Sequence, residues 1–348
     1  MTFRDTSRLT TSLINISRLT IPPVLAENIR RFAEDIVPVN AKPRRNLEWQ
    51  DILRYQPKFI KMVKNHPEFT HHLAQTLAEK SKIIYLQGLN MPSVDSNVIP
   101  QTNHITDSEM IGNRDVAICK ISSSMLLGLL VNTNKKGKVF QTVYPTDESK
   151  GSNTKFDGDR ELLWHNDGWN KGVDELTILV GVKGHEAVKT KVILAETIID
   201  YFKKNGKEEE LKYLMCITTI AEHPQDFDFV HEKIIDPETN EIRFAKYGCF
   251  GYHQNDAKVL NAIKLLQQYL EEIDPDFSES LQSGDMLILQ NKYGLHARET
   301  SQIIGTSQRM LLRSRVYGGE DGLRESLPDG MVSMAKTEGL KGKEGLGK

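Results

Sequence analysis

The amino-acid sequence predicts a mixed, mainly β protein whose sheet folds back on itself like a barrel, with helices before the sheet and inserted into it. Runs rich in β-branched residues, such as 175–182, are typical of strands. Apolar residues at helical spacing precede and interrupt these runs. His165 and Asp167 lie two positions apart, and a third group with matching chemistry, His296, lies far downstream. A short spacing plus a remote third ligand suits a closed, barrel-like sheet.

The helices are predicted from this apolar spacing. Pro22 and Pro23 stand at the start of a helix over 20–37, and a second helix fits 69–82. Helical patterns also cover 193–205 and 208–214, and 258–273 is the clearest amphipathic helix.

The strands are predicted from short apolar or alternating runs that end at turn residues. They are expected at 83–86, 139–144, 175–182, 216–221, 241–244, 284–291 after an initial turn, and 308–317. Residues 146–160 are polar and lead as a loop into the run that contains His165 and Asp167. This places the pair at a junction of loop and strand, where a rigid scaffold commonly presents ligands.

Composition describes a globular chain of 348 residues, 39% hydrophobic and 26% charged, with a net charge of −2. Such a balance gives no reason to expect a nucleic-acid or membrane partner. The three cysteines are odd in number and widely spaced, which favours reduced thiols over a disulfide framework. With no secretory pattern and no apolar run near the roughly 20 residues of a membrane helix, we expect a cytoplasmic protein.

Two histidines and one carboxylate form the candidate metal site. Two residues is the side-chain repeat of an extended strand, so His165 and Asp167 can point the same way. With His296 they make the facial donor set that non-heme Fe(II) oxygenases use, leaving positions open for a bidentate 2-oxo acid and then for dioxygen. A zinc site that activates water for hydrolysis uses the same ligands and is the alternative.

Three arginines in the last predicted strand carry the next hypothesis. A 2-oxoglutarate co-substrate brings a distal carboxylate, and the planar guanidinium group of arginine matches it bidentately. Arg309, Arg313 and Arg315 share one face of this strand by the period of two. Pairing with surface carboxylates is the alternative for each of them.

Two groups of residues together resemble the clavaminate synthase-like, TauD-related Fe(II)- and 2-oxoglutarate-dependent oxygenases. The resemblance spans roughly residues 75–318. The downstream group is Gly284-Asp285, Asn291, Leu295-His296-Ala297-Arg298, Gln308-Arg309 and Arg313. The upstream group is Phe140-Gln141-Thr142-Val143, Pro145, Leu162, Trp164-His165, Asp167, Asp174 and a threonine at 190.

The resemblance implies a fold and a role for each matching residue. The fold is a double-stranded β-helix (jelly roll, cupin-like) with flanking N-terminal and inserted helices, in one domain over 1–330. Residues 1–75 would be its mostly helical part, 76–318 its core, and 331–348 a flexible tail. His165, Asp167 and His296 would bind iron, and Arg309 and Thr190 would bind 2-oxoglutarate. Arg313 would hold a substrate carboxylate, and Gln141 would line the substrate pocket.

Two departures from the family pattern bear on the substrate. Many amino-acid hydroxylases of this group carry glutamate where Asp167 stands, which moves the match towards the TauD side. Members that act on arginine or lysine usually place acidic residues after the strand that corresponds to 242–244. This chain has Ala245-Lys246-Tyr247 there, which disfavours a cationic substrate side chain. Asp226 and Asp228 could replace the acidic residues, but an acidic surface loop is the better interpretation of them. The carboxylate ligand disfavours a halogenase.

The sequence therefore predicts an enzyme that hydroxylates an unactivated C–H bond of a free L-amino acid or derivative, with CO2 and succinate as co-products. Fe(II), 2-oxoglutarate and O2 are the expected cofactors and co-substrates. The alternatives are the same chemistry on another small acid such as a sulfonate, desaturation or epoxidation, and a non-catalytic binding protein on this scaffold. The oligomeric state, and whether Arg313 or Arg315 contacts the substrate, stay open.

Overall fold

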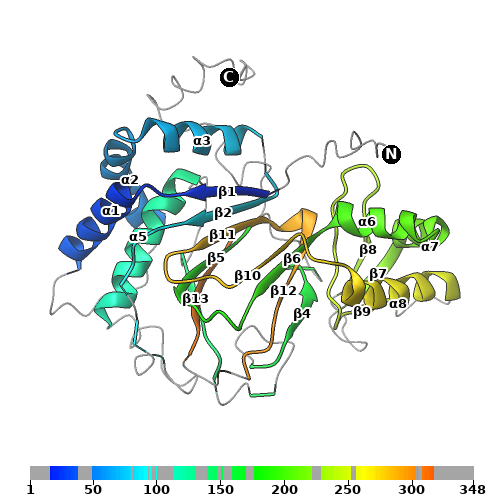
Figure 1. Cartoon of the computed structure of the whole chain (residues 1–348). Coiled ribbons are helices and arrows are strands. Elements are labelled where there is room, and N and C mark those ends of the chain that lie inside the picture. The colour runs from blue at the N-terminus through cyan, green and yellow to red at the C-terminus, as the bar shows by residue number, and fades with distance from the viewer. Residues whose placement is uncertain are drawn as a thin grey trace, which may run out of the picture.

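The computed structural model describes residues 16–37, 49–79, 81–92, 94–95, 99, 113–130, 139–146, 150–151, 159–169, 176–221, 229–251, 256–302, 304 and 308–316. Within them it is a mixed α/β structure of several helices and three β-sheets (Figure 1). The predicted tail at 331–348 and residues Asp226 and Asp228 lie outside the described residues.

The largest sheet has six strands in the order β1-β2-β11-β5-β13-β3. Their bounds are β1 Ile16–Thr20, β2 Ile83–Gln87, β11 Met286–Gln290, β5 Leu176–Lys183, β13 Met310–Val316 and β3 Gln141–Val143. Only the β1–β2 pair is parallel, and the other pairs are antiparallel. Four helices pack on its outer face: α1 Pro23–Ile36, α2 Trp49–Val63, α3 Pro67–Ala78 and α5 Arg114–Leu130.

A second sheet has four antiparallel strands in the order β10-β6-β12-β4. The strands are β10 Phe277–Glu279, β6 Thr190–Leu194, β12 Gly294–Arg298 and β4 Leu162–His165. The 3-10 turn η3, Asn291–Tyr293, joins β11 of the first sheet directly to β12 of the second. Because the chain crosses between sheets in so few residues, the two sheets are held close together at this edge.

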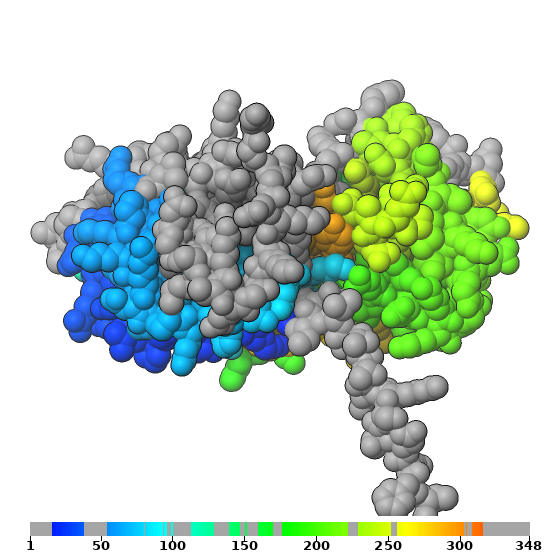
Figure 2. Space-filling model, turned by 90° about the horizontal axis from the view of Figure 1, so that it is seen from above, coloured from blue at the N-terminus to red at the C-terminus, as the bar shows by residue number. Residues whose placement is uncertain are grey.

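A helical layer and a small sheet cover the other face of the four-stranded sheet. The layer contains α6 Ala195–Lys204, α7 Glu208–Leu214 and α8 Ala257–Glu272, and the small sheet has the order β8-β7-β9, from Val230–Lys233, Ile217–Ala221 and Cys249–Phe250. Figures 1 and 2 show this layer and the N-terminal helices on opposite flanks of the molecule.

The buried apolar residues form three clusters that follow these layers. One lies between the N-terminal helices and the six-stranded sheet, and another joins the four-stranded sheet to α6, α7 and α8. The third contains inward-facing residues of both sheets, among them Leu179, Val192, Leu287 and Leu311. Strand alternation explains this division: Leu311 belongs to the inner cluster, whereas its neighbours Met310 and Leu312 face the helices.

Most predicted elements are confirmed within a few residues, and one is wrong. The predicted helix over 193–205 begins at Ala195, because Ile193 and Leu194 belong to β6, where they pair with Leu295 and Gly294 of β12. The predicted strand over 241–244 is not a strand, and Ile242 makes a single isolated bridge. In both places tertiary contacts override the local pattern.

Residues Arg114–Leu130 form the mainly apolar helix α5, which was not predicted from the sequence. Among the described residues, no helix has the length and apolar character needed to cross a membrane.

Candidate metal centre

Two neighbouring strands bring the two histidines together. His165 ends β4, and His296 is the middle residue of β12. The two strands pair in antiparallel register with His165 directly opposite His296, and the centroids of their rings lie 4.3 Å apart. Cross-strand partners put their side chains on the same face of a sheet. The register of one strand pair therefore places two imidazoles side by side.

Asp167 lies in the turn that follows β4. The next residue, Gly168, has φ +76°, a left-handed conformation that favours glycine and turns the chain away after the carboxylate. The side chain of Asn291 fixes this turn, because its Oδ1 accepts from Asp167 N at 3.0 Å and its Nδ2 donates to Asp167 O at 2.9 Å. Thr177 Oγ1 donates to Asp167 Oδ2 at 2.6 Å.

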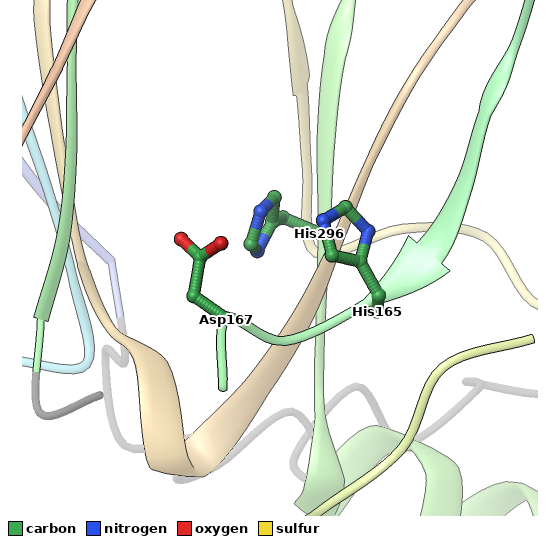
Figure 3. A group of neighbouring side chains, drawn as sticks. All are labelled: His165, Asp167 and His296. Carbon is green, nitrogen blue, oxygen red and sulfur yellow. The ribbon is translucent and has the colours of Figure 1, made fainter. Parts of the chain in front are cut away.

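His165, Asp167 and His296 form one compact, buried group. One ligand atom from each lies within 4.8 Å of the other two. The three residues are only 5%, 5% and 6% exposed. Figure 3 shows the three side chains pointing into a common space from β4, the following turn and β12.

The environment sets the protonation that a metal site requires. Burial lowers the pKa of both histidines, for His296 to about 3 with His165 contributing, so both imidazoles are neutral near pH 7. Burial alone would raise the pKa of Asp167, but His296, Arg313, His165 and the hydrogen bond from Thr177 together lower it to about 2. Neutral imidazole and ionised carboxylate are the forms that bind a metal.

The donor set fits a divalent transition metal. His165 Nδ1 donates to Leu163 O at 2.8 Å, which leaves Nε2 as the ligand atom of this ring. His296 Nδ1 is buried and has no hydrogen-bond partner among the described residues, so the protein alone leaves this ring incompletely satisfied. Two imidazoles and one carboxylate on one side of a metal leave its other side open for further ligands.

Arg309 is a buried guanidinium group directly before β13. It is 4% exposed and donates from Nη2 to Thr190 Oγ1 at 3.5 Å, on the strand that pairs with β12 of His296. Burial, and then the nearby charge of Arg298, lower its pKa to about 9. Among the described residues, no carboxylate forms a salt bridge with Arg309. A buried cation in such surroundings favours an anionic ligand.

Arg313 and Arg315 follow Arg309 on the inner face of β13. Arg313 Nη2 donates to Gln141 Oε1 at 3.0 Å, and its Nη1 lies 3.4 Å from Asp167 Oδ1. Arg315 Nη1 lies 3.8 Å from the same oxygen. The predicted shared face of this strand is confirmed, and Gln141 is brought to it because β3 pairs Gln141 with Arg313.

The segment after Ile242 runs beside β4 without forming a regular strand. Asn166 Nδ2 donates to Ile242 O at 2.7 Å, and Phe244 N donates to Asn166 Oδ1 at 3.1 Å. The buried side chain of Asn166 therefore makes hydrogen bonds with the backbone of this segment that a neighbouring strand would otherwise make. Lys246, farther along this segment, forms an ion pair with Glu271 of α8.

Sequence reasoning missed the contribution of Thr177 and left Asn291 without a role. Both contact Asp167, and Thr177 Oγ1 also lies 3.3 Å from Asn291 Oδ1. The sequence does indicate the position of Thr177, because it is a polar residue in an otherwise apolar strand and lies two residues from Leu179, whose side chain faces inward. Nothing in the sequence identified its partner.

No protein-family model matches the chain, and no curated protein sequence matches it.

Comparison with solved structures does find similar folds. One is asparagine oxygenase in complex with Fe(II), 2S,3S-3-hydroxyasparagine and succinate, with TM-score 0.60, 15% identity, and coverage of 86% of this chain and 93% of that chain. Another is the non-heme iron oxygenase OrfP in complex with Fe and alpha-ketoglutaric acid, with TM-score 0.57, 15% identity, and coverage of 87% and 94%. At these identities, the likeness establishes a shared fold.

Proposed function

We propose that the chain is an Fe(II)- and 2-oxoglutarate-dependent oxygenase that hydroxylates an unactivated C–H bond of a free L-amino acid or a close derivative. CO2 and succinate would be the co-products. The observation that carries the proposal is the buried group of His165, Asp167 and His296, together with the buried cation Arg309, which contacts Thr190 on the strand next to that of His296. Zinc hydrolysis explains the first feature, but it does not call for a buried arginine.

The solved structures with similar folds support this choice. The asparagine oxygenase structure holds Fe(II), a hydroxylated asparagine and succinate, and an OrfP structure holds Fe, succinate and (3S)-hydroxy-L-Arg. Both pair an amino-acid product with the co-product expected here. We therefore assign this chain the same class of reaction, with its own substrate.

We also propose that the two facing sheets are the halves of a double-stranded β-helix, or jelly roll. In favour of this, inward-facing residues of both sheets share one apolar cluster. Two of the three proposed iron ligands lie on the paired strands β4 and β12 of the four-stranded sheet and the third in the turn after β4, while Arg313 and Arg315 come from the six-stranded sheet. Ligands for the metal and for the organic acids thus reach one space from opposite sides.

Each residue has a stated task in this proposal. His165, Asp167 and His296 hold Fe(II), which when bound supplies the oxidation chemistry with 2-oxoglutarate and dioxygen. Arg309 binds the distal carboxylate of 2-oxoglutarate, and Thr190 donates a hydrogen bond to the same co-substrate. Arg313 binds the substrate carboxylate, and Gln141 lines the pocket and orients Arg313. The surrounding apolar cluster excludes bulk water.

The test is a succinate-release screen. The protein, loaded with Fe(II) and 2-oxoglutarate in air, is offered a panel of L-amino acids, and products are examined by mass spectrometry. The proposal predicts substrate-dependent succinate together with a product heavier by one oxygen atom. Succinate formation without such a product for any panel member would refute amino-acid hydroxylation. No succinate above the metal-free control would refute the oxygenase itself.

A further inference from the structure

We propose that the substrate carries two anionic groups, as an acidic amino acid does, and that Arg315 binds the second one. This inference rests on the proposed function and specifies its substrate. The first group is the α-carboxylate, which binds to Arg313. The second is a side-chain carboxylate, or a sulfonate or phosphate in the same place, which binds to Arg315.

The geometry points both guanidinium groups at the metal centre. Arg313 Nη1 and Arg315 Nη1 lie 3.4 Å and 3.8 Å from the same atom, Asp167 Oδ1. Charge-assisted hydrogen bonds normally measure about 2.7–2.9 Å. Both cations therefore contact Asp167 at distances longer than a short charge-assisted hydrogen bond. Asp167 Oδ1 is also the oxygen that does not accept the hydrogen bond of Thr177.

Strand pairing supports a common position for the two arginines. On β5, the partner of Arg313 is Leu179 and the partner of Arg315 is Thr177. Leu179 belongs to the inner cluster and Thr177 contacts Asp167, so both arginines stand on the face that lines the site. Their side chains are 11% and 34% exposed, which puts Arg313 deeper and Arg315 nearer the surface.

The charge of the site favours a second anionic group. Arg313 and Arg315 both lie against the same carboxylate, that of Asp167. A divalent metal adds two positive charges, and 2-oxoglutarate with its two carboxylates offsets them. A second anionic group on the substrate adds a negative charge next to these two guanidinium groups, which is favourable where water is largely excluded.

The segment beside His165 agrees with this charge. Ala245, Lys246 and Tyr247 offer no carboxylate, and Lys246 pairs with Glu271 on α8. The centroid of the Tyr247 ring lies 6.0 Å from that of His165, so this part of the segment approaches the metal centre without an anionic group. A cationic side chain would meet no opposite charge in this segment.

Matched pairs of ligands test the inference. The protein with Fe(II) and saturating 2-oxoglutarate is titrated without oxygen by calorimetry with L-aspartate against L-asparagine, and L-glutamate against L-glutamine. Each pair differs by one anionic group and hardly in size. L-cysteate and O-phospho-L-serine then distinguish a sulfonate or phosphate site from a carboxylate site. We expect at least one acid to bind roughly tenfold or more tightly than its neutral counterpart.

Substitution of Arg315 tests its assignment. Arg315→Gln should weaken binding of the preferred acid roughly 10- to 100-fold, while the neutral counterpart changes less than about threefold. Arg315→Lys keeps the charge and should retain part of the preference. Arg30→Gln is the matched control, because Arg30 is a similarly exposed arginine, paired with Glu27 and Glu34 on α1, and should change neither affinity.

The outcomes separate this inference from the proposed function. A visible charge-transfer band on adding Fe(II) and 2-oxoglutarate, together with equal affinity for acids and amides, would overturn only the acidic substrate. Equal weakening of acid and amide by Arg315→Gln would overturn only the role of Arg315. If the band never forms, the iron site is wrong and this inference falls with it.

Discussion

At the scale of single residues, Asp167 gives its two carboxylate oxygens different surroundings. Oδ2 accepts the hydrogen bond of Thr177 at 2.6 Å, while Oδ1 lies towards Arg313 and Arg315. A hydrogen bond on one oxygen fixes the rotation of the carboxylate, and with it the direction of the other oxygen. Thr177 is thus a positioning residue for the candidate metal centre.

Thr177→Val keeps the shape of the side chain and removes this hydrogen bond. We expect affinity for Fe(II), measured by anaerobic titration, to fall roughly 10- to 100-fold. Thr142→Val is the matched control, because Thr142 is also buried in a strand but its Oγ1 has no hydrogen-bond partner among the described residues. The control should bind iron like the wild type. Equal affinity in both variants would remove the positioning role from Thr177.

In the proposed function, Arg309 and Arg313 bind different organic acids. Arg309→Ala should raise the 2-oxoglutarate concentration needed for half-maximal succinate release by about 100-fold or more, because a buried charged partner is lost, and should spare iron binding. Arg313→Ala should instead raise mainly the substrate KM. Initial rates with one ligand varied at a time measure this split. Equal loss of affinity for both ligands in both variants would show that the division of tasks is incorrect.

At the scale of elements, the β4–β12 pair matters most, and the sequence predicted only part of it. The loop-to-strand junction at His165 could be recognised, since a polar stretch leads into an apolar run. The facing of His165 and His296 depends on the register between two strands far apart in the chain, which no local pattern in the sequence reveals. Likewise, Ile193 and Leu194 continue a helical pattern, and only pairing with β12 makes them part of a strand.

The turn before β11 depends on a glycine. Gly284 has φ +91°, and a Cβ there would lie 1.9 Å from Leu89 O. We expect Gly284→Ala to lower the free energy of unfolding by roughly 2–4 kcal/mol, from backbone strain and the clash together. Denaturant titration measures the change.

Gly206→Ala is the control for backbone strain alone. Gly206 also has a positive φ, +65°, but nothing lies within 4 Å of the added Cβ. Its cost should be about 1–2 kcal/mol. If both substitutions lowered the free energy of unfolding equally, the contact between Leu89 O and a Cβ at position 284 would not contribute to the cost.

At the scale of the whole molecule, burial of the site links stability to pH. Burial keeps the pKa of both histidines below 6.5, and that of His296 at about 3. The unfolded chain, with imidazoles near pKa 6.5, therefore takes up protons first as the pH falls. The metal-free protein should lose stability below pH 6.5, by up to about 1.4 kcal/mol per pH unit for each such histidine.

His296→Gln tests this linkage. The variant should have a shallower decline of the free energy of unfolding between pH 6.5 and about 4.5, above the range in which most carboxylates titrate. Denaturant unfolding of metal-free protein across this window gives the slope. An unchanged slope would mean that His296 is protonated as readily in the folded chain as in the unfolded one.

The molecule as a whole explains why the chemistry was easier to predict than its supports. The chemistry of His165, Asp167, His296 and the arginines can be predicted from their spacing and from the alternation of side chains along a strand. The residues that position them cannot be predicted in this way, because Asn291, Thr177 and Asn166 act through contacts between segments far apart in the sequence. The layers of the fold bring these segments together, and no local pattern in the sequence predicts those contacts.

The proposed function requires that His165, Asp167 and His296 bind Fe(II) and that 2-oxoglutarate binds at the same site. Its most direct test is anaerobic titration of the metal-free protein with Fe(II) and 2-oxoglutarate, followed by visible absorption. We predict a weak charge-transfer band that needs both additions and is absent in Asp167→Ala. No band with the wild-type protein, together with hydrolytic activity supported by zinc, would contradict the account.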